Sequence, residues 1–243
     1  GLVRYVNNPS DVYGYVRYIV EGSDAETKGI TRGMLFNKVD GTQLTDSNFG
    51  SLLFSSNTSI TIELADYNNG NPTENGTVIQ LTKNNATDNP IKISKVFDEG
   101  VSKIGYLMYN QFASSFDEDL NAAFGQFQSE GITDLIIDLR YNGGGFVSSA
   151  IHMSGMITGQ FNNQLLYTQE WNSKVQDAFS DQPDFFNTNF RDQLLFLNQN
   201  NEEISLGNLN SLNLSRVYFI ISGSTASASE LVITALEPYI TVN

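Results

Sequence analysis

Residues 217–236 read VYFIISGSTASASELVITAL. The apolar run 217–221 predicts a strand, and the apolar spacing of residues 231–236 predicts a helix. Only a few, mostly small residues separate the two, so the strand turns directly into the helix. The helix N-terminus at such a turn presents unpaired N–H groups and the positive end of the helix dipole, which stabilise negative charge. The stretch therefore predicts an α/β fold with a site at this turn.

Ser227 is the residue that we expect at the N-terminus of this helix. A serine in that position suits a nucleophile, and the N–H of Ala228 suits one half of an oxyanion hole. The spacing Ser227-x-x-Glu230 is also that of a capping box, in which each side chain bonds the other residue's N–H. These residues alone leave both interpretations open.

A second strand-to-helix turn lies upstream. The apolar run 132–139 is typical of a strand buried on both faces, and residues 147–158 are expected to form a helix. Three glycines, residues 143–145, stand between them without a following Lys-Ser or Lys-Thr, which excludes a P-loop. Such glycines also let backbone N–H groups approach a reacting carbonyl closely. Asp138 and Arg140 are expected to pair and fix this turn.

The residues before this strand complete a βαβ unit. Residues 103–110 predict a strand, and Ser115 with Glu118 predicts a capping box that opens an amphipathic helix. Gly131 is expected to end that helix. The connection between the two parallel strands is expected to be a right-handed crossover.

Residues 1–95 are β-rich, with strands expected at 2–6, 15–20 and 34–39. Two stretches of this region resemble a PDZ domain of the bacterial protease-associated kind. They are YIVEGS at residues 18–23 and GITRGMLFNKVDG at residues 29–41.

Three further motifs follow this PDZ-like segment in order, IGYL at residues 104–107, GITDLIIDLRYNGGG at residues 131–145 and TASASE at residues 225–230. In this combination they resemble the carboxyl-terminal processing (tail-specific) peptidases, a serine endopeptidase family with a crotonase-like core. The resemblance implies an α/β protein in which a ClpP/crotonase-type peptidase core, residues 96–243, follows a PDZ-like peptide-binding domain, residues 1–95.

The resemblance also implies residue roles. Ser227 would be the nucleophile, and the N–H groups of Ala228 and Gly144 would form the oxyanion hole. Substrate contacts would come from Gly145 and from the first strand, where a peptide's carboxyl end would add beside Gly1, Leu2 and Val3. The substrate would be an exported or misfolded protein, or a peptide, with a free C-terminus. The expected location is the periplasm or the cell envelope.

The chain departs from the family pattern at the general base. In the family a lysine that follows the serine accepts its proton, but the last lysine here is Lys174, so the expected lysine lies past Asn243. A lysine must have its pKa lowered by burial to act in this way. His152 is the one histidine of the chain, and we expect it to be a packed helix residue rather than the base.

Composition excludes several classes of function. A net charge of −14 disfavours nucleic acid and anionic membranes as partners. With no cysteine and one histidine, thiolate and His-rich metal sites are excluded, and we expect no metal or cofactor. No apolar run approaches the roughly 20 residues that span a bilayer. Because the chain begins and ends inside expected strands, we expect it to be an internal portion of a longer protein, a processed form, or a chain with missing ends.

Two other functions stay open. A non-catalytic peptide-binding protein would keep the PDZ-like groove without a base, and a crotonase-type acyl-thioester enzyme would share the oxyanion glycines without needing the serine. Residues 160–215 are the least regular, and we expect strands and loops there in which the aromatic residues mostly pack; these are Trp171, Phe185, Phe186 and Phe190.

Overall fold

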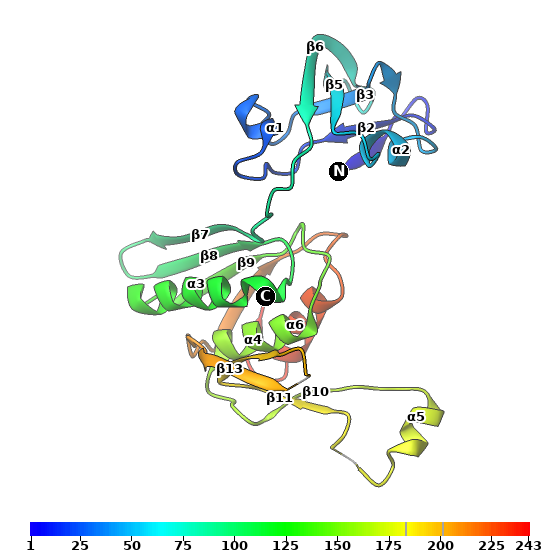
Figure 1. The fold of residues 1–243 in the computed structure, drawn as a ribbon. Coiled ribbons are helices and arrows are strands. Elements are labelled where there is room, and N and C mark those ends of the chain that lie inside the picture. Colours follow the sequence, from blue (N-terminus) through cyan, green and yellow to red (C-terminus); the bar gives the residue numbers. More distant parts are fainter. Residues whose placement is uncertain (183, 201) are drawn as a thin grey trace. The chain divides into compact units, whose positions relative to one another are not determined.

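The computed structural model describes residues 1–182, 184–200 and 202–243. The chain divides into two compact units, Gly1–Asp88 and Asn89–Asn243 (Figure 1). The sequence predicts the boundary after residue 95. It lies earlier because strand β7 (Ile91–Asp98) pairs along its length with β8 (Lys103–Tyr109) of the second unit.

The first unit is an antiparallel sheet with two short helices. Its strand order is β1-β2-β3-β5-β6, and β4 pairs with β3. The helices are α1 (Asp24–Thr27) and α2 (Phe49–Leu53). The strands are β1 (Leu2–Arg4), β2 (Val12–Tyr15), β3 (Leu35–Val39), β4 (Thr42–Gln43), β5 (Ser59–Asp66) and β6 (Thr73–Thr82).

Two features of this unit bear on the predictions. The expected strand at residues 15–20 is wrong beyond Tyr15, where β2 ends. The core is small and is built on alternating strand residues, with Val39 and Leu44 fully buried. Strand β1 lies at the edge of the sheet and is hydrogen-bonded to β2 on one side.

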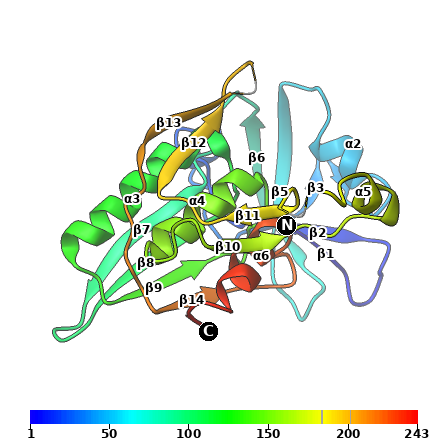
Figure 2. The ribbon, with the colours of Figure 1, turned by 90° about the horizontal axis from the view of Figure 1, so that it is seen from below.

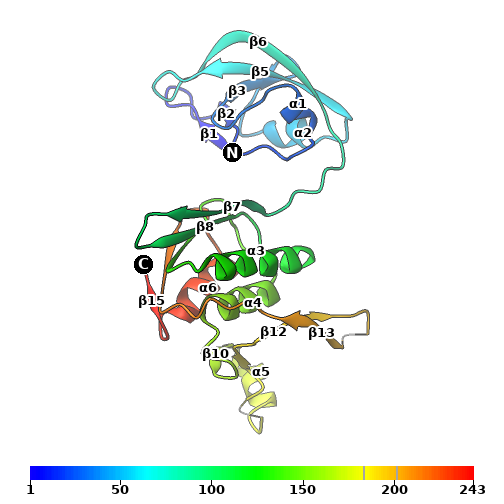
Figure 3. The same ribbon diagram turned by 90° about the vertical axis from the view of Figure 1, so that its left-hand side faces the viewer.

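The second unit is a five-stranded mixed sheet in the order β15-β14-β9-β8-β7. Strands β8, β9 (Asp134–Asp138), β14 (Arg216–Ile220) and β15 (Thr241–Val242) are parallel, and β7 is antiparallel to β8. Three helices pack on one side of this sheet (Figure 3). They are α3 (Asp117–Glu130), α4 (Val147–Thr158) and α6 (Ala228–Leu236).

The burial of side chains along β9 shows which face of the sheet the helices cover. Leu135 and Ile137 are fully buried against the helices, whereas Ile136, on the other face, is half-buried. The prediction of a strand buried on both faces is therefore only partly correct. The prediction of a helix at residues 147–158 is confirmed, because α4 has these bounds.

The start of α3 differs from the prediction. A 3-10 turn, η1 (Ser114–Phe116), precedes the helix, and the N-cap is Phe116 without a side-chain cap. The predicted capping box of Ser115 and Glu118 is therefore wrong. The end of α3 is as expected, since Gly131 adopts the left-handed conformation (φ 68°) that glycine tolerates.

The described residues between α4 and β14 form two small antiparallel sheets and one short helix, α5 (Ser173–Ala178) (Figure 2). Phe186 and Phe190 are buried, as expected of packing residues, while Trp171 and Phe185 are half exposed. The strands are β10 (Leu165–Thr168), β11 (Asn187–Asn189), β12 (Gln193–Leu197) and β13 (Glu203–Asn208). In the described residues no helix is long and apolar enough to cross a membrane.

Candidate active site

Ser227 lies between β14 and α6 in a strained conformation. Its φ is 57° and its ψ is −118°, a region that residues with a Cβ atom rarely adopt. Four other non-glycine residues in the described ranges have positive φ, and all four are Asp or Asn, which tolerate it. Ser227 is solvent-exposed. Its N–H donates to Oε2 of Glu230 at 2.8 Å, so the Glu230 half of the predicted capping box is present.

The glycine turn lies directly against Ser227. A Cβ atom added to Gly144 would stand 2.7 Å from Cβ of Ser227 and 3.0 Å from N of Ala228. Any side chain there would force the two turns apart. The structure thus brings together two turns that lie far apart in the sequence, and glycine is the residue that permits the approach.

Gly144 itself does not offer a free N–H. Its N–H donates to Oδ1 of Asn142 at 2.9 Å. The role of this N–H in an oxyanion hole stays a prediction, and the structure shows that the donor already has a partner within the turn. The contribution of Gly144 is its lack of a side chain.

Gly145 is the neighbouring donor. The carbonyl between Gly144 and Gly145 accepts a hydrogen bond from the Phe112 N–H at 2.9 Å. In a trans peptide the N–H points opposite to the C=O, so the Gly145 N–H is directed away from Phe112. Among the described residues neither this N–H nor that of Ala228 has a protein acceptor. A Cβ atom on Gly145 would lie 2.0 Å from the Phe112 oxygen, which makes glycine obligatory.

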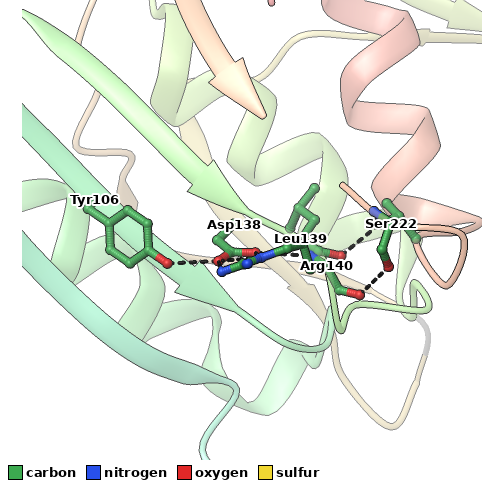
Figure 4. A network of polar contacts seen from close by, with 6 residues as sticks. Tyr106, Asp138, Leu139, Arg140 and Ser222 are labelled. Carbon is green, nitrogen blue, oxygen red and sulfur yellow. Dashed lines mark hydrogen bonds and ion pairs between the residues drawn. The ribbon is translucent and has the colours of Figure 1, made fainter. Parts of the chain in front are cut away.

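Hydroxyl groups tie the two turns together (Figure 4). Oγ of Ser222 donates to the carbonyl oxygen of Arg140 at 2.6 Å. Oγ1 of Thr225 donates to the carbonyl oxygen of Leu139 at 2.8 Å. These bonds hold the segment before Ser227 against the segment before the glycines. Serine and threonine in this loop therefore have a structural role in addition to being small.

An ion pair braces the start of the glycine turn (Figure 4). The Arg140 guanidinium bonds Asp138, with Nη2 and Oδ2 2.5 Å apart, and the Tyr106 hydroxyl donates to the same oxygen at 2.7 Å. Burial disfavours the Asp138 carboxylate, but the hydrogen bonds from Arg140 and Tyr106 outweigh it and lower the pKa of Asp138. The predicted pair of Asp138 and Arg140 is confirmed.

His152 is engaged away from Ser227. It is buried in α4, and its Nε2 accepts the Leu195 N–H at 3.2 Å, while Nδ1 lies 2.9 Å from Oδ2 of Asp117. Because Nε2 is an acceptor, the proton is on Nδ1, which donates to Asp117. Both ring nitrogens are occupied, so His152 is a packed residue. In the described part of the chain no lysine or histidine bonds Ser227.

A pocket of about 340 Å³ adjoins the end of the glycine turn, and its lining is half apolar and half polar or charged. Its wall includes Phe146 from the end of the glycine turn and Ile151 from α4. Residues 195–197 of β12 also line the pocket, together with Asp117 and an ion pair between Arg191 and Glu203, 2.8 Å apart. The pocket is large enough to hold a side chain, and its lining offers both apolar and polar contacts.

The first unit has a pocket at the edge strand. A cavity of about 350 Å³ is lined by residues from β1 and its start, from the segment after β2, from β3 and from the α2 region; they are Gly1, Leu2, Arg17, Phe36, Leu53 and Phe54. Val3 is 40% exposed on the same strand.

The sheet with helices on one side defines a mixed α/β protein, and the exposed serine against a glycine turn is its candidate nucleophile. The chain belongs to peptidase family S41, whose family model matches residues 103–239.

Similarity extends beyond the matched region. The chain is 28% identical over 236 residues to a carboxy-terminal-processing protease of Bartonella bacilliformis, covering 90% of this chain and 44% of that protein. A chloroplastic C-terminal processing peptidase of Tetradesmus obliquus is 25% identical over 147 residues, which are 56% of this chain and 32% of the relative. The chain spans less than half the length of the curated relatives it matches.

Solved structures agree on the fold. A chain of Bacteroides fragilis NCTC 9343 assigned to the S41 proteases superposes with a TM-score of 0.69 at 26% identity, over 100% of this chain and 60% of that one. The photosystem II D1 C-terminal processing protease gives a TM-score of 0.50 at 19% identity, over 98% of this chain and 56% of that one. The latter similarity concerns the fold alone.

Sequence reasoning missed Asn142. It stands two residues before Gly144 in the quoted motif that ends in three glycines, and it is fully buried. The available signal was the Asn-x-Gly spacing, since asparagine side chains often accept the N–H two residues further on.

Proposed function

We propose that this chain is a portion of a serine endopeptidase of the carboxyl-terminal processing type, with a crotonase-like core and a PDZ-like first unit. The observation that carries the proposal is the strained, exposed Ser227 held against a glycine turn. A conformation that costs free energy persists at a turn where its side chain is presented to substrate. The membership in family S41 and the relatives' names support the same reaction.

The proposed reaction begins with attack by Oγ of Ser227 on a peptide carbonyl carbon. The hydroxyl proton passes to a general base as the Oγ–C bond forms, and the carbonyl oxygen becomes an oxyanion. The C–N bond then breaks, the base returns the proton to the leaving amine, and an acyl-enzyme remains on Ser227. Water hydrolyses the acyl-enzyme by the same proton transfers.

We propose that the N–H groups of Ala228 and Gly145 stabilise the oxyanion. Ala228 is the first residue of α6, so the helix dipole adds to its N–H. The general base in this proposal is a lysine that follows Asn243 in the full-length protein. The pocket lined by Phe146 and Ile151 would receive a substrate side chain.

The proposed substrate is a protein or peptide with a free C-terminus, bound as an added strand beside β1 in the first unit. The edge position of β1 and the pocket lined by Gly1 and Leu2 support this role. We further propose that the protein works in the periplasm or cell envelope, which accords with a chain without cysteine.

The test compares two serine variants of the full-length protein. Ser227→Ala is expected to abolish hydrolysis of an unstructured protein such as casein. Ser224→Ala changes an exposed serine of the same turn and serves as the matched control, with activity expected to remain. Casein hydrolysis by Ser227→Ala at the wild-type rate would refute the assignment.

A non-catalytic peptide-binding protein is the second candidate. It is favoured by one observation, that no base bonds Ser227 within the described residues. A full-length wild type that binds peptides with a free C-terminus, but does not hydrolyse them, would establish this alternative.

A further inference from the structure

Asn142 connects three segments around the candidate site. It is fully buried, at the start of the glycine turn. Its side-chain amide donates to the carbonyl oxygen of Tyr109 at 3.0 Å, at the end of β8. Its Oδ1 accepts the Gly144 N–H at 2.9 Å. Both functional groups of the side chain are therefore used, one toward the sheet and one within the turn.

The main chain of Asn142 bonds the other turn. Its carbonyl oxygen accepts from Oγ of Ser229 at 3.2 Å and from the Ala226 N–H at 3.3 Å. These two donors stand on either side of Ser227 and Ala228. One residue thus fixes the glycine turn to the sheet and the serine turn to the glycine turn.

The glycine turn needs such a clamp. Gly144 (φ 103°) and Gly145 (φ 140°) occupy conformations that only glycine adopts readily, and glycine backbones rotate with little restraint. The bond from Gly144 to Asn142 fixes the peptide before Gly144, and the bond from Phe112 fixes the peptide after it. Together they set the direction of the Gly145 N–H.

We propose that Asn142 is a positioning residue that sets the Gly145 N–H at the correct place relative to Ser227 and the Ala228 N–H. The inference rests on the proposed function and deepens it. Asn142 touches no substrate, so its effect is expected on kcat, because an oxyanion donor acts mainly in the transition state.

The test uses Asn142→Asp in the full-length enzyme. In its ionised form the new carboxylate cannot donate to the Tyr109 carbonyl, and it places a negative charge behind the oxyanion hole. A protonated carboxyl group restores both bonds, since it has one donor and one acceptor oxygen. Burial and the facing carbonyl raise the pKa of this carboxyl group, so it takes up a proton at moderately acidic pH.

The ratio of variant to wild-type kcat is measured between about pH 8 and pH 5, which cancels the titration of the shared general base. We expect the ratio to be about 0.01–0.1 at the alkaline end and to rise at least about fivefold toward the acidic end, with KM unchanged within about threefold. The folded fraction is recorded by circular dichroism at each pH.

Asn121→Asp is the matched control. In α3 the Asn121 amide also donates to a main-chain carbonyl, that of Asn208, and its Oδ1 also accepts a main-chain N–H, that of Asn210. The substitution therefore alters the same two kinds of hydrogen bond, at a residue that is remote in sequence from both the glycine turn and the serine turn. Its kcat ratio is expected to be flat and near one.

Ser229→Ala provides a second variant in case Asn142→Asp unfolds. It removes the Ser229 bond to the Asn142 carbonyl and leaves the Asn142 side chain in place. We expect kcat to fall about three- to tenfold with KM unchanged. A flat Asn142→Asp ratio, or an unchanged kcat for Ser229→Ala, would overturn the inference while the peptidase assignment stands. An inactive wild type would overturn the peptidase assignment and the inference with it.

Discussion

At the scale of single residues, Ser227 has a strained backbone conformation that also exposes its hydroxyl group. A residue with a Cβ atom at φ 57° and ψ −118° is destabilised relative to glycine, because its Cβ crowds the backbone. Leu231 and Glu230 hold the turn through bonds to the carbonyl and the N–H of Ser227. The conformation is therefore maintained by the helix that follows, and it exposes the hydroxyl group.

This strain predicts a difference between two inactive variants. Ser227→Gly is expected to be more stable than Ser227→Ala by about 1–2 kcal/mol, since both lack the hydroxyl but only alanine keeps the strained Cβ. Urea unfolding of the two variants measures the difference. Equal stabilities would mean that the backbone of this turn is not strained.

Glycines 144 and 145 illustrate two different uses of one residue type. Gly144 is needed because Ser227 and Ala228 approach it, and Gly145 is needed because the Phe112 carbonyl does. In both cases the missing Cβ matters through contacts with distant segments. Their order in the sequence does not show which of the two offers a free N–H.

At the scale of elements, the buried contact between α3, α4 and β12 is the feature that sequence patterns did not indicate. Nε2 of His152, in α4, accepts a hydrogen bond from the Leu195 N–H of β12. Nδ1 of the same ring donates to Asp117 at the start of α3. Oδ1 of Asp117 is buried without a partner, so this carboxylate depends on His152 for its side-chain bond. The helix therefore begins with Asp117 directed inward.

We predict that His152→Ala destabilises the protein without removing the chemistry. Losing both bonds leaves a buried carboxylate unpaired and the Leu195 N–H unsatisfied, which is expected to lower the free energy of unfolding by about 2–4 kcal/mol. Urea unfolding measures this change, and kcat at a temperature where the variant is folded is expected within about threefold of wild type. A loss of activity in the folded variant would instead support a Ser-His mechanism.

At the scale of the whole molecule, the proposed function assigns the chemistry to the second unit and peptide recognition to the first. The second unit carries the serine and glycine turns, and the first unit has an edge strand beside a pocket. In the proposed function, recognition and chemistry would then lie on units with separate hydrophobic cores.

This separation predicts that peptide binding survives loss of the nucleophile. In a Ser227→Ala background, a peptide with an apolar C-terminal residue and a free carboxylate is expected to bind at least about tenfold more tightly than its amidated form. Leu53→Asp, which places a charge in the pocket, is expected to weaken binding by a similar factor. Fluorescence anisotropy of labelled peptides measures both effects.

Val78→Asp is the control for this experiment. Val78 is an exposed apolar residue of β6, at the opposite edge of the same sheet from β1. Its substitution is expected to leave peptide affinity unchanged. Equal binding of the free and amidated peptides would contradict recognition of the carboxyl end.

Local pattern alone determined much of this protein. Periodicity gave α4, the βαβ unit and the strand-to-helix turn at Ser227, because these depend on neighbouring residues and on the alternation of apolar side chains. The order of the quoted motifs indicated the family that the match over residues 103–239 confirms. The short-range pair of Asp138 and Arg140 was predictable for the same reason.

Tertiary structure decided what depends on distant partners. The Gly144 N–H is taken by Asn142, the Asn142 carbonyl bonds the serine turn, and both nitrogens of His152 are occupied. The boundary between the units was also decided by the sheet: β7 forms a hairpin with β8, and β8 in turn pairs with β9 of the second unit, whose strand lies about 30 residues further along the chain. A donor's availability is a property of all groups around it, and folding brings most of those groups from elsewhere in the chain.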